Sequence, residues 1–333
     1  MDATVTADTT TLSYWLNWRV FACAILVLVA LHSIWKYEGR RNNPKSVEEE
    51  VGEEVSGVLY AEEAWRPCLK QIHPAWLLAF RIVALCLLLA TLIAKLCLSG
   101  AKIFFYYTQW TFTLLIVYFG FGSVLSIYGC FQHYEINKDC VNRREDLDPE
   151  KGPYLPLSYG RAKSISGMKK GADLIGKDSF VRTAGTWGYV FQILFQVNGG
   201  AVMLTDSVYW TVIFPFLTIK DYDLGFMTIN LHSLNAVLLL GDTALNSMRF
   251  PLFRISYFIL WTGAFMIFQW IIHACVSIWW PYPFLDLSSR SAPLWYMLVG
   301  LMQIPCYGIF VLLVKLKHHV QGKLFPSSYQ YVP

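Results

Sequence analysis

The side chains best suited to chemistry in this sequence are a threonine and a histidine within apolar segments. Thr108 lies in FFYYTQWTFTLL, residues 104–115, and His232 begins HSLNAVLLLGD, residues 232–242. A threonine hydroxyl is a weak nucleophile until a base within hydrogen-bond reach takes its proton, and the base works best when a third group orients it. The two residue types together therefore predict a hydroxyl nucleophile with a histidine base.

Polar side chains inside a membrane also have a purely structural interpretation. They often join helices by hydrogen bonds, and a threonine can bond the carbonyl of residue i−4 on its own helix without any further partner. The residues alone therefore leave two alternatives open. One is catalysis by Thr108 and His232, and the other is a helix-joining or ligand-binding role for the same side chains.

Further polar residues are expected to surround this pair. Thr111 shares a helix face with Thr108 and is a rival nucleophile. Gln269 and His273 are spaced i, i+4 near the outer end of a later segment. The side chains that could orient the His232 imidazole are Asn235, Asp206 and His273, and those that could donate to an oxyanion are Gln109 and the Trp110 indole.

The composition indicates which elements must position these residues. The chain has 333 residues, of which 55% are hydrophobic and only 15% are charged, and its mean hydropathy is +0.41. Soluble domains carry about 25% charged residues, so the sequence predicts an all-α, polytopic membrane helix bundle. A helix needs about 20 apolar residues to cross a bilayer core of about 30 Å. Seven transmembrane helices are predicted, at 13–35, 76–98, 103–131, 185–216, 224–247, 253–279 and 292–315.

The distribution of positive charge predicts the orientation of these helices. Of the 27 Lys and Arg residues, 21 fall in the loops and tail of one side and only Lys102, Lys220 and Arg290 fall on the other. The positive-inside rule then places the N-terminus outside or in a lumen and the C-terminus in the cytosol. The remaining three, Arg19, Arg81 and Lys95, lie near predicted helix ends, where we expect them to snorkel to the headgroups.

This topology predicts that Thr108 and His232 occupy one layer of the bundle. The spans at 103–131 and 224–247 both start on the outer side. At 1.5 Å per residue, Thr108 lies roughly 8 Å and His232 roughly 12 Å below the outer surface. On its helix, His232 is expected to share a face with Asn235, and Asp206 lies in the outer part of the preceding span.

The domain organisation follows the same pattern. Residues 1–12 are predicted to be a short outer N-terminus, and 13–35 a retained helix, because no positive n-region precedes it and no small-residue cleavage site follows. Residues 36–75 and 132–184 are cytosolic loops, and 317–333 a cytosolic tail. The over-long span at 185–216 contains Asn198-Gly199-Gly200, which predicts a kink or a tilt.

Three short motifs resemble the androgen-induced and rolling stone family of multipass membrane proteins. They are YYTQWTFTLL at 106–115, HSLNAVLLLGD at 232–242 and WPYPFLDL at 280–287, and the similarity runs in matching order over 76–316. Some animal members of that family hydrolyse fatty acid esters of hydroxy fatty acids with a membrane-embedded Thr and His. The resemblance implies that these are Thr108 and His232, and the lumenal motif of the family falls on Trp280, Tyr282, Pro283, Phe284 and Leu285. The span at 13–35 and the long loop at 132–184 depart from the animal pattern.

The leading hypothesis is therefore a threonine hydrolase that cleaves lipid esters inside an endomembrane or plasma membrane. The alternative is a non-enzymatic seven-helix protein that binds lipid or acts as a receptor, although receptor-type Asp-Arg-Tyr and Asn-Pro-x-x-Tyr motifs are absent from the third and seventh spans. No metal or nucleotide cofactor is expected, because Gly-rich phosphate loops and His/Glu zinc signatures are absent. The predicted partner is a membrane lipid or lipid ester, and the net charge of +4 is too small to favour nucleic acid.

Overall fold

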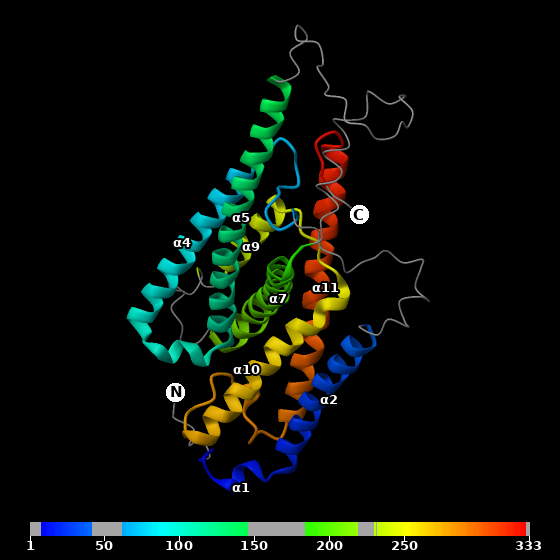
Figure 1. The fold of residues 1–333 in the computed structure, drawn as a ribbon. Coiled ribbons are helices and arrows are strands. Elements are labelled where there is room, and N and C mark those ends of the chain that lie inside the picture. Colours follow the sequence, from blue (N-terminus) through cyan, green and yellow to red (C-terminus); the bar gives the residue numbers. More distant parts are fainter. Residues whose placement is uncertain (1–7, 42–61, 146–183, 219–229, 231, 331–333) are drawn as a thin grey trace.

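The structure is a computed structural model that describes residues 8–41, 62–145, 184–218, 230 and 232–330. Helices make up its framework, and the described part contains two isolated β-bridges but no strand. The α-helices are α1 (Leu12–Trp15), α2 (Trp18–Arg41), α4 (Pro74–Ser99), α5 (Tyr107–Glu145), α7 (Thr186–Val208), α9 (Leu234–Leu245), α10 (Ile255–Cys275) and α11 (Ala292–Leu324). Short 3₁₀ turns η1 (Ala101–Phe105), η3 (Leu252–Arg254) and η4 (Pro283–Leu285) and the π-helix η2 (Tyr209–Thr218) connect them (Figure 1). The predicted all-α helix bundle is confirmed.

Five described helices are long and apolar enough to cross a membrane. They are Trp18–Lys36, Pro74–Ser99, Tyr107–Lys138, Leu252–Cys275 and Ala292–Leu324. Each matches one of the predicted spans, and the chain is accordingly a multipass membrane protein. The predicted span at 185–216 falls on α7 and η2. The span at 224–247 falls partly outside the described residues, and its described helix, α9, has 12 residues.

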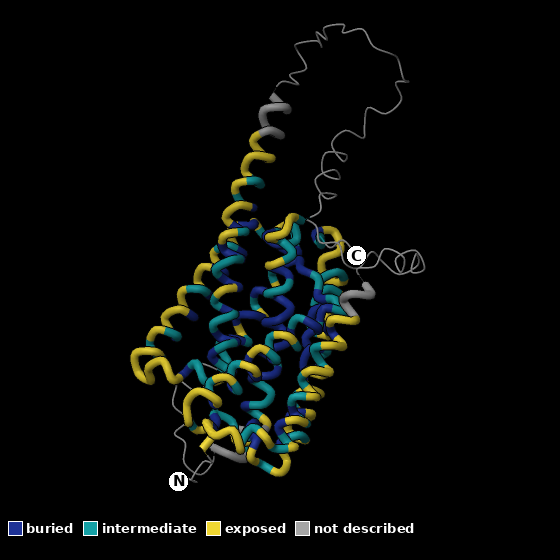
Figure 2. Tube along the Cα trace, turned by 60° about the horizontal axis from the view of Figure 1, so that its bottom comes forward, coloured by how far each residue is buried: buried dark blue, intermediate teal, exposed yellow. Residues whose placement is uncertain are grey.

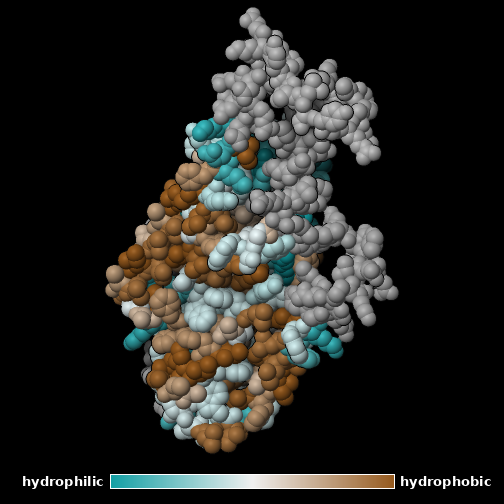
Figure 3. Space-filling view, viewed as in Figure 1, coloured by the Kyte–Doolittle hydropathy of each residue, from teal (hydrophilic) through white to brown (hydrophobic). Residues whose placement is uncertain are grey.

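The surface of the bundle matches this assignment. Large apolar side chains are exposed along the outer faces of the long helices, such as Val83, Leu87 and Ile93 on α4. Hydrophobic side chains cover most of the visible face in Figure 3, and hydrophilic ones gather at the end where α5 projects past the bundle. Buried residues lie in the middle of the bundle, between the helices (Figure 2). A helix bundle with apolar side chains on its outer surface is suited to a lipid environment.

Helix α7 lies at the centre of the bundle and contacts α5, α9, α10 and α11. Its two adjacent glycines allow aromatic rings to pack against its backbone. A Cβ on Gly199 would lie 2.7 Å from the Phe250 ring, and one on Gly200 would lie 2.6 Å from the Phe258 ring. Helix α7 is continuous through these residues, and the hydrogen-bonding pattern changes only at Tyr209, where η2 begins. The glycines thus serve close packing, and the helix widens nearer Pro215, a residue without a backbone N–H.

The N-terminal helix is fastened to the rest of the bundle. Helix α2 packs against α10 and α11. The Tyr14 hydroxyl donates to Asp286 Oδ1 at 3.0 Å and accepts from the Trp280 indole at 3.2 Å. Arg19 donates to the Ser288 carbonyl at 2.6 Å. Helices α1 and α2 are therefore joined to the connection between α10 and α11.

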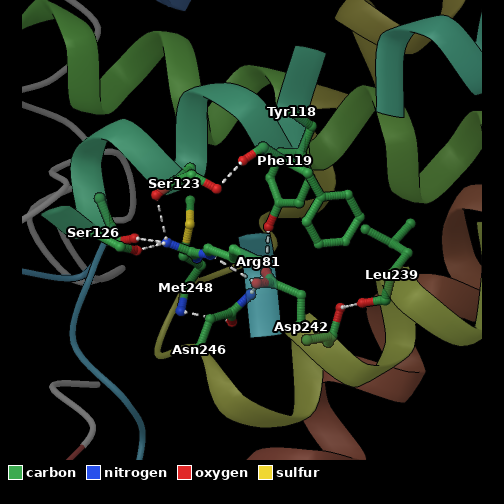
Figure 4. A network of polar contacts seen from close by, with 12 residues as sticks. Arg81, Tyr118, Phe119, Ser123, Ser126, Leu239, Asp242, Asn246 and Met248 are labelled. Atoms are coloured by element: carbon green, nitrogen blue, oxygen red, sulfur yellow. Dashed lines mark hydrogen bonds and ion pairs between the residues drawn. The ribbon is translucent and has the colours of Figure 1, made fainter. Parts of the chain in front are cut away.

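Arg81 does not snorkel to the headgroups, which corrects the prediction made from its place near a helix end. Its side chain is fully buried, and Nε donates to Asp242 Oδ1 at 2.8 Å (Figure 4). Asp242 also accepts hydrogen bonds from the Tyr118 hydroxyl and, at 2.9 Å, from Asn246 Nδ2. Arg81 Nη1 donates to the Ala64 carbonyl, the Gly122 carbonyl and Ser126 Oγ. The network joins α4, α5 and α9, and it holds in place the helix that follows His232.

Candidate functional site

Thr108 lies in the first turn of α5. The turn η1 ends at Phe105, and Tyr106 is extended, so the helix begins sharply at Tyr107. The first amides of an α-helix have no intrahelical partner, and they carry the positive end of the helix dipole. Around Thr108, the Tyr107 amide donates to the Tyr282 hydroxyl at 3.2 Å and the Gln109 amide to the Tyr106 carbonyl at 3.1 Å. Thr108 therefore lies at the start of the helix, as expected for residues 104–115 starting a span.

His232 lies in a turn before α9, so its predicted place on a helix face is wrong. Helix α9 begins only at Leu234. The imidazole stacks on Tyr209, with ring centroids 3.6 Å apart and planes 4° from parallel. The Trp210 indole donates to the His232 carbonyl at 3.1 Å. The first residues of η2 therefore fix both the ring and the backbone of this histidine.

Asp206 stands next to the imidazole. Its Oδ1 atom lies 3.8 Å from His232 Nδ1, and the two side chains are only 14% and 11% exposed. Asn235 Nδ2 donates to the same Oδ1 atom at 3.1 Å. Among the described residues, neither His232 Nδ1 nor Asp206 Oδ2 has a hydrogen-bond partner. The predicted grouping of Asp206, His232 and Asn235 is therefore present, and Nδ1 is the ring nitrogen that faces the carboxyl group.

Thr108 and His232 line one cavity of about 280 Å³. Asn235 and Asp206 do not line this cavity. Asp206 contacts His232, and Asn235 contacts Asp206. The cavity wall comes from α5, α7, η2, α10, α11 and the connection that includes η4. Besides Thr108 and His232, it consists of Tyr107, Leu204, Thr205, Val208, Tyr209, Thr262, Phe265, Met266, Tyr282, Phe284, Leu285, Trp295, Leu298, Val299 and Met302. The two residues predicted to do chemistry thus share an almost wholly apolar chamber.

One wall of the cavity also faces the outside of the bundle. Trp295, Leu298 and Met302 lie on one face of α11, line the cavity and are 36–39% exposed. In a membrane, this face of α11 would contact acyl chains. These three side chains therefore touch both the cavity and the outer surface of the bundle.

Four other predicted site residues do not reach the cavity wall. Thr111 and Gln109 are buried and lie outside the lining. The Trp110 indole donates to the Phe104 carbonyl at 2.9 Å, so it is not available to an oxyanion. The His273 ring is fully buried and stacks on Trp280, with centroids 3.7 Å apart, and its Nδ1 pairs with the Gln269 carbonyl at 2.7 Å. His273 therefore does not orient His232.

The sequence predicted no role for two tyrosines that contact Thr108 or His232. Tyr209 stacks on His232, and nothing in the sequence indicates this contact. The Tyr282 hydroxyl accepts from the Tyr107 amide at 3.2 Å and makes hydrogen-bonding interactions with Thr108. Tyr282 belongs to the WPYPFLDL motif, which was the only available sign of its importance.

The chain matches no protein-family model, and no curated protein or solved structure was found to be similar to it. The resemblance to the androgen-induced and rolling stone family therefore stays a prediction that rests on the three motifs.

Proposed function

We propose that this protein is an intramembrane threonine hydrolase that cleaves lipid esters, with Thr108 as nucleophile and His232 as base. The observation that carries the proposal is that both side chains line one apolar cavity, and that Asp206 Oδ1 lies 3.8 Å from His232 Nδ1. A nucleophile, a base and an orienting group are the three parts that hydroxyl catalysis requires.

The proposed reaction has two steps. With Nδ1 facing Asp206, His232 takes the Thr108 proton on Nε2. At the same time, Thr108 Oγ bonds to the ester carbonyl carbon, and the electron pair of the C=O bond moves to the carbonyl oxygen. When this intermediate collapses, the carbon–oxygen bond to the alcohol breaks, and the His232 proton passes to the departing alcohol. Water then attacks the acyl-threonine with the same base, and release of the fatty acid restores Thr108.

The cavity supports a lipid as substrate. Its lining is dominated by aliphatic and aromatic side chains, which match an acyl chain, and few polar groups are present besides those near Thr108 and His232. A cavity of about 280 Å³ lies near the lower end of the usual range of about 300–1,000 Å³ for ligand sites. Trp295, Leu298 and Met302 both line the cavity and lie partly exposed on the outside of the bundle, so a substrate that already resides in the membrane would enter past them.

The test combines active-site labelling with turnover. Purified protein in lipid nanodiscs would be treated with a fluorophosphonate probe and, separately, with fatty acid esters of hydroxy fatty acids. Thr108→Ala should abolish labelling, and His232→Ala should reduce both labelling and turnover by about 10²–10⁴-fold, the usual contribution of a general base. Thr111→Ala should retain both. If labelling persists in Thr108→Ala and His232→Ala, or disappears only in Thr111→Ala, the assignment of the nucleophile is wrong.

The apolar lining also favours a second function, lipid binding without catalysis. The same cavity would then hold a lipid, and the polar pair would only anchor its headgroup. Native mass spectrometry of the purified protein distinguishes the two functions. A lipid retained equally by wild type and Thr108→Ala, with no labelling or turnover in either, would support the binding protein and refute the hydrolase.

A further inference from the structure

Neighbouring aromatic rings hold Tyr282 in the wall of the cavity that Thr108 and His232 line. It lies in the connection between α10 and α11, directly before η4. Its ring stacks on Phe284, with centroids 5.2 Å apart, and meets Tyr106 edge to face at 5.9 Å. These contacts hold the phenol ring against the start of α5.

The Tyr282 hydroxyl points at the N-terminus of α5. It accepts from the Tyr107 amide at 3.2 Å, and it interacts with both the side chain and the amide of Thr108. An oxyanion formed by attack of Thr108 Oγ develops within about 3 Å of that Oγ atom. A donor stabilises the oxyanion from a distance of about 3 Å. Because the hydroxyl interacts with Thr108, it lies on the side of that residue from which it could donate to the oxyanion.

The protonation state of Tyr282 suits a hydrogen-bond donor. Burial raises the pKa of Tyr282 to about 12. The phenol therefore keeps its proton at neutral pH, and it cannot serve as a base for Thr108. Its hydrogen is free to turn toward a new acceptor, while its oxygen remains positioned by the Tyr107 amide.

The donors that the sequence suggested for this role are elsewhere. The Trp110 indole is bonded to the Phe104 carbonyl, and Gln109 does not line the cavity. Among the residues that line the cavity, Tyr282 is the one whose hydroxyl contacts both the side chain and the amide of Thr108.

We infer that Tyr282 is a further catalytic residue of the proposed hydrolase, and that its hydroxyl donates to the oxyanion. This inference rests on the proposed function of Thr108 and His232. As Thr108 Oγ bonds to the carbonyl carbon, the Tyr282 O–H donates to the carbonyl oxygen, which gains the electron pair. The phenol keeps its covalent proton throughout, and His232 alone carries the proton from Thr108 to the alcohol.

The test removes the phenol oxygen and nothing else. Tyr282→Phe and the matched control Tyr307→Phe would be compared with wild type in nanodiscs. Tyr307 is a buried phenol that donates to the Pro251 carbonyl at 2.9 Å and does not line the cavity. For Tyr282→Phe, kcat and the maximal rate of fluorophosphonate labelling should fall about 10²–10³-fold, as for loss of one oxyanion donor. KM and the probe concentration for half-maximal rate should change by less than about threefold, because the contact strengthens only in the transition state. Tyr307→Phe should leave kcat and the maximal labelling rate within about threefold of wild type.

Two outcomes separate this inference from the proposed function. If Tyr282→Phe retains the wild-type kcat while Thr108→Ala is inactive, the role of Tyr282 is refuted and the hydrolase stands. If Thr108→Ala retains activity, the hydrolase itself is refuted. Should Tyr282→Phe fail to fold, fluorinated tyrosines at position 282 keep the hydroxyl and change only its acidity. The labelling rate should then vary with phenol acidity, and a constant rate would overturn the inference, since a hydroxyl that only joins two segments would not produce this dependence.

Discussion

The buried pair of Arg81 and Asp242 provides the most quantitative prediction about the fold. Both side chains are completely inaccessible to solvent, and Nε lies 2.8 Å from Oδ1. Asp242→Ala removes the acceptor of three hydrogen bonds, which come from Arg81, Tyr118 and Asn246. It also leaves the Arg81 charge buried without a counter-ion.

The expected cost can be worked from these contacts. Arg81 keeps Ser126 and two carbonyl acceptors after the change, so its guanidinium stays partly satisfied. Breaking a buried pair by removing one partner costs about 3–5 kcal/mol of folding free energy. Arg81→Met leaves Asp242 as an uncompensated carboxylate and should cost a similar amount. The double variant removes both charges and should be less destabilised than the sum of the single variants, by about 2–3 kcal/mol.

The assay is reversible unfolding in mixed micelles, with free energies of unfolding measured for wild type, both single variants and the double variant. Arg19→Met is the control. Its guanidinium bonds the exposed Ser288 carbonyl, so we expect a loss of about 1 kcal/mol or less. Single variants that each cost under about 1 kcal/mol, or a coupling below about 0.5 kcal/mol, would contradict the buried pair. Such values would instead fit an arginine that reaches the headgroups.

Two further predictions concern packing and accessibility. Gly200→Ala would place a Cβ 2.6 Å from the Phe258 ring, whereas Gly300 has no atom within 4 Å of the corresponding position. Overpacking should therefore cost Gly200→Ala about 1–3 kcal/mol, while Gly300→Ala should gain up to about 1 kcal/mol from helix propensity; equal melting temperatures would refute the close packing. Cys68 is buried, its thiol bonds the backbone of Asn246, and burial raises its pKa. At about pH 8, near the ordinary thiol pKa of about 8.5, maleimide should label the exposed Cys275 and spare Cys68 until the protein is unfolded. Peptide mapping measures both sites, and similar labelling of both in the folded protein would contradict the burial.

The helices of this protein were predictable because a bilayer selects them by length and apolarity. Segments such as 76–98 and 292–315 need no partner to be recognised, since every residue in about 20 must suit hydrocarbon. The same reasoning predicts one layer for Thr108 and His232, and the two side chains line one cavity. Once spans and orientation are assigned, depth follows from the rise per residue alone. The sequence alone therefore predicts the depth of a residue along the membrane normal.

Arg81 shows where this reasoning stops. Near a helix end, the sequence alone favours snorkelling, because the partner that changes the outcome, Asp242, is 161 residues away. The same holds for His232, whose turn is shaped by stacking on Tyr209 and by the Trp210 indole. In each case a contact between distant segments overrides the local preference.

The sequence by itself determined that the chain is a bundle of membrane helices, and it predicted a similar depth for Thr108 and His232, which line one cavity. Only the tertiary structure decided how the helices are rotated and which side chains face one another. It brought Tyr282 to Thr108 and Asp206 to His232, and it turned Trp110 and His273 away from the cavity. The physical reason is that hydrophobicity along a helix specifies its depth in lipid. Its rotation and neighbours depend on packing and on hydrogen bonds that no single segment contains.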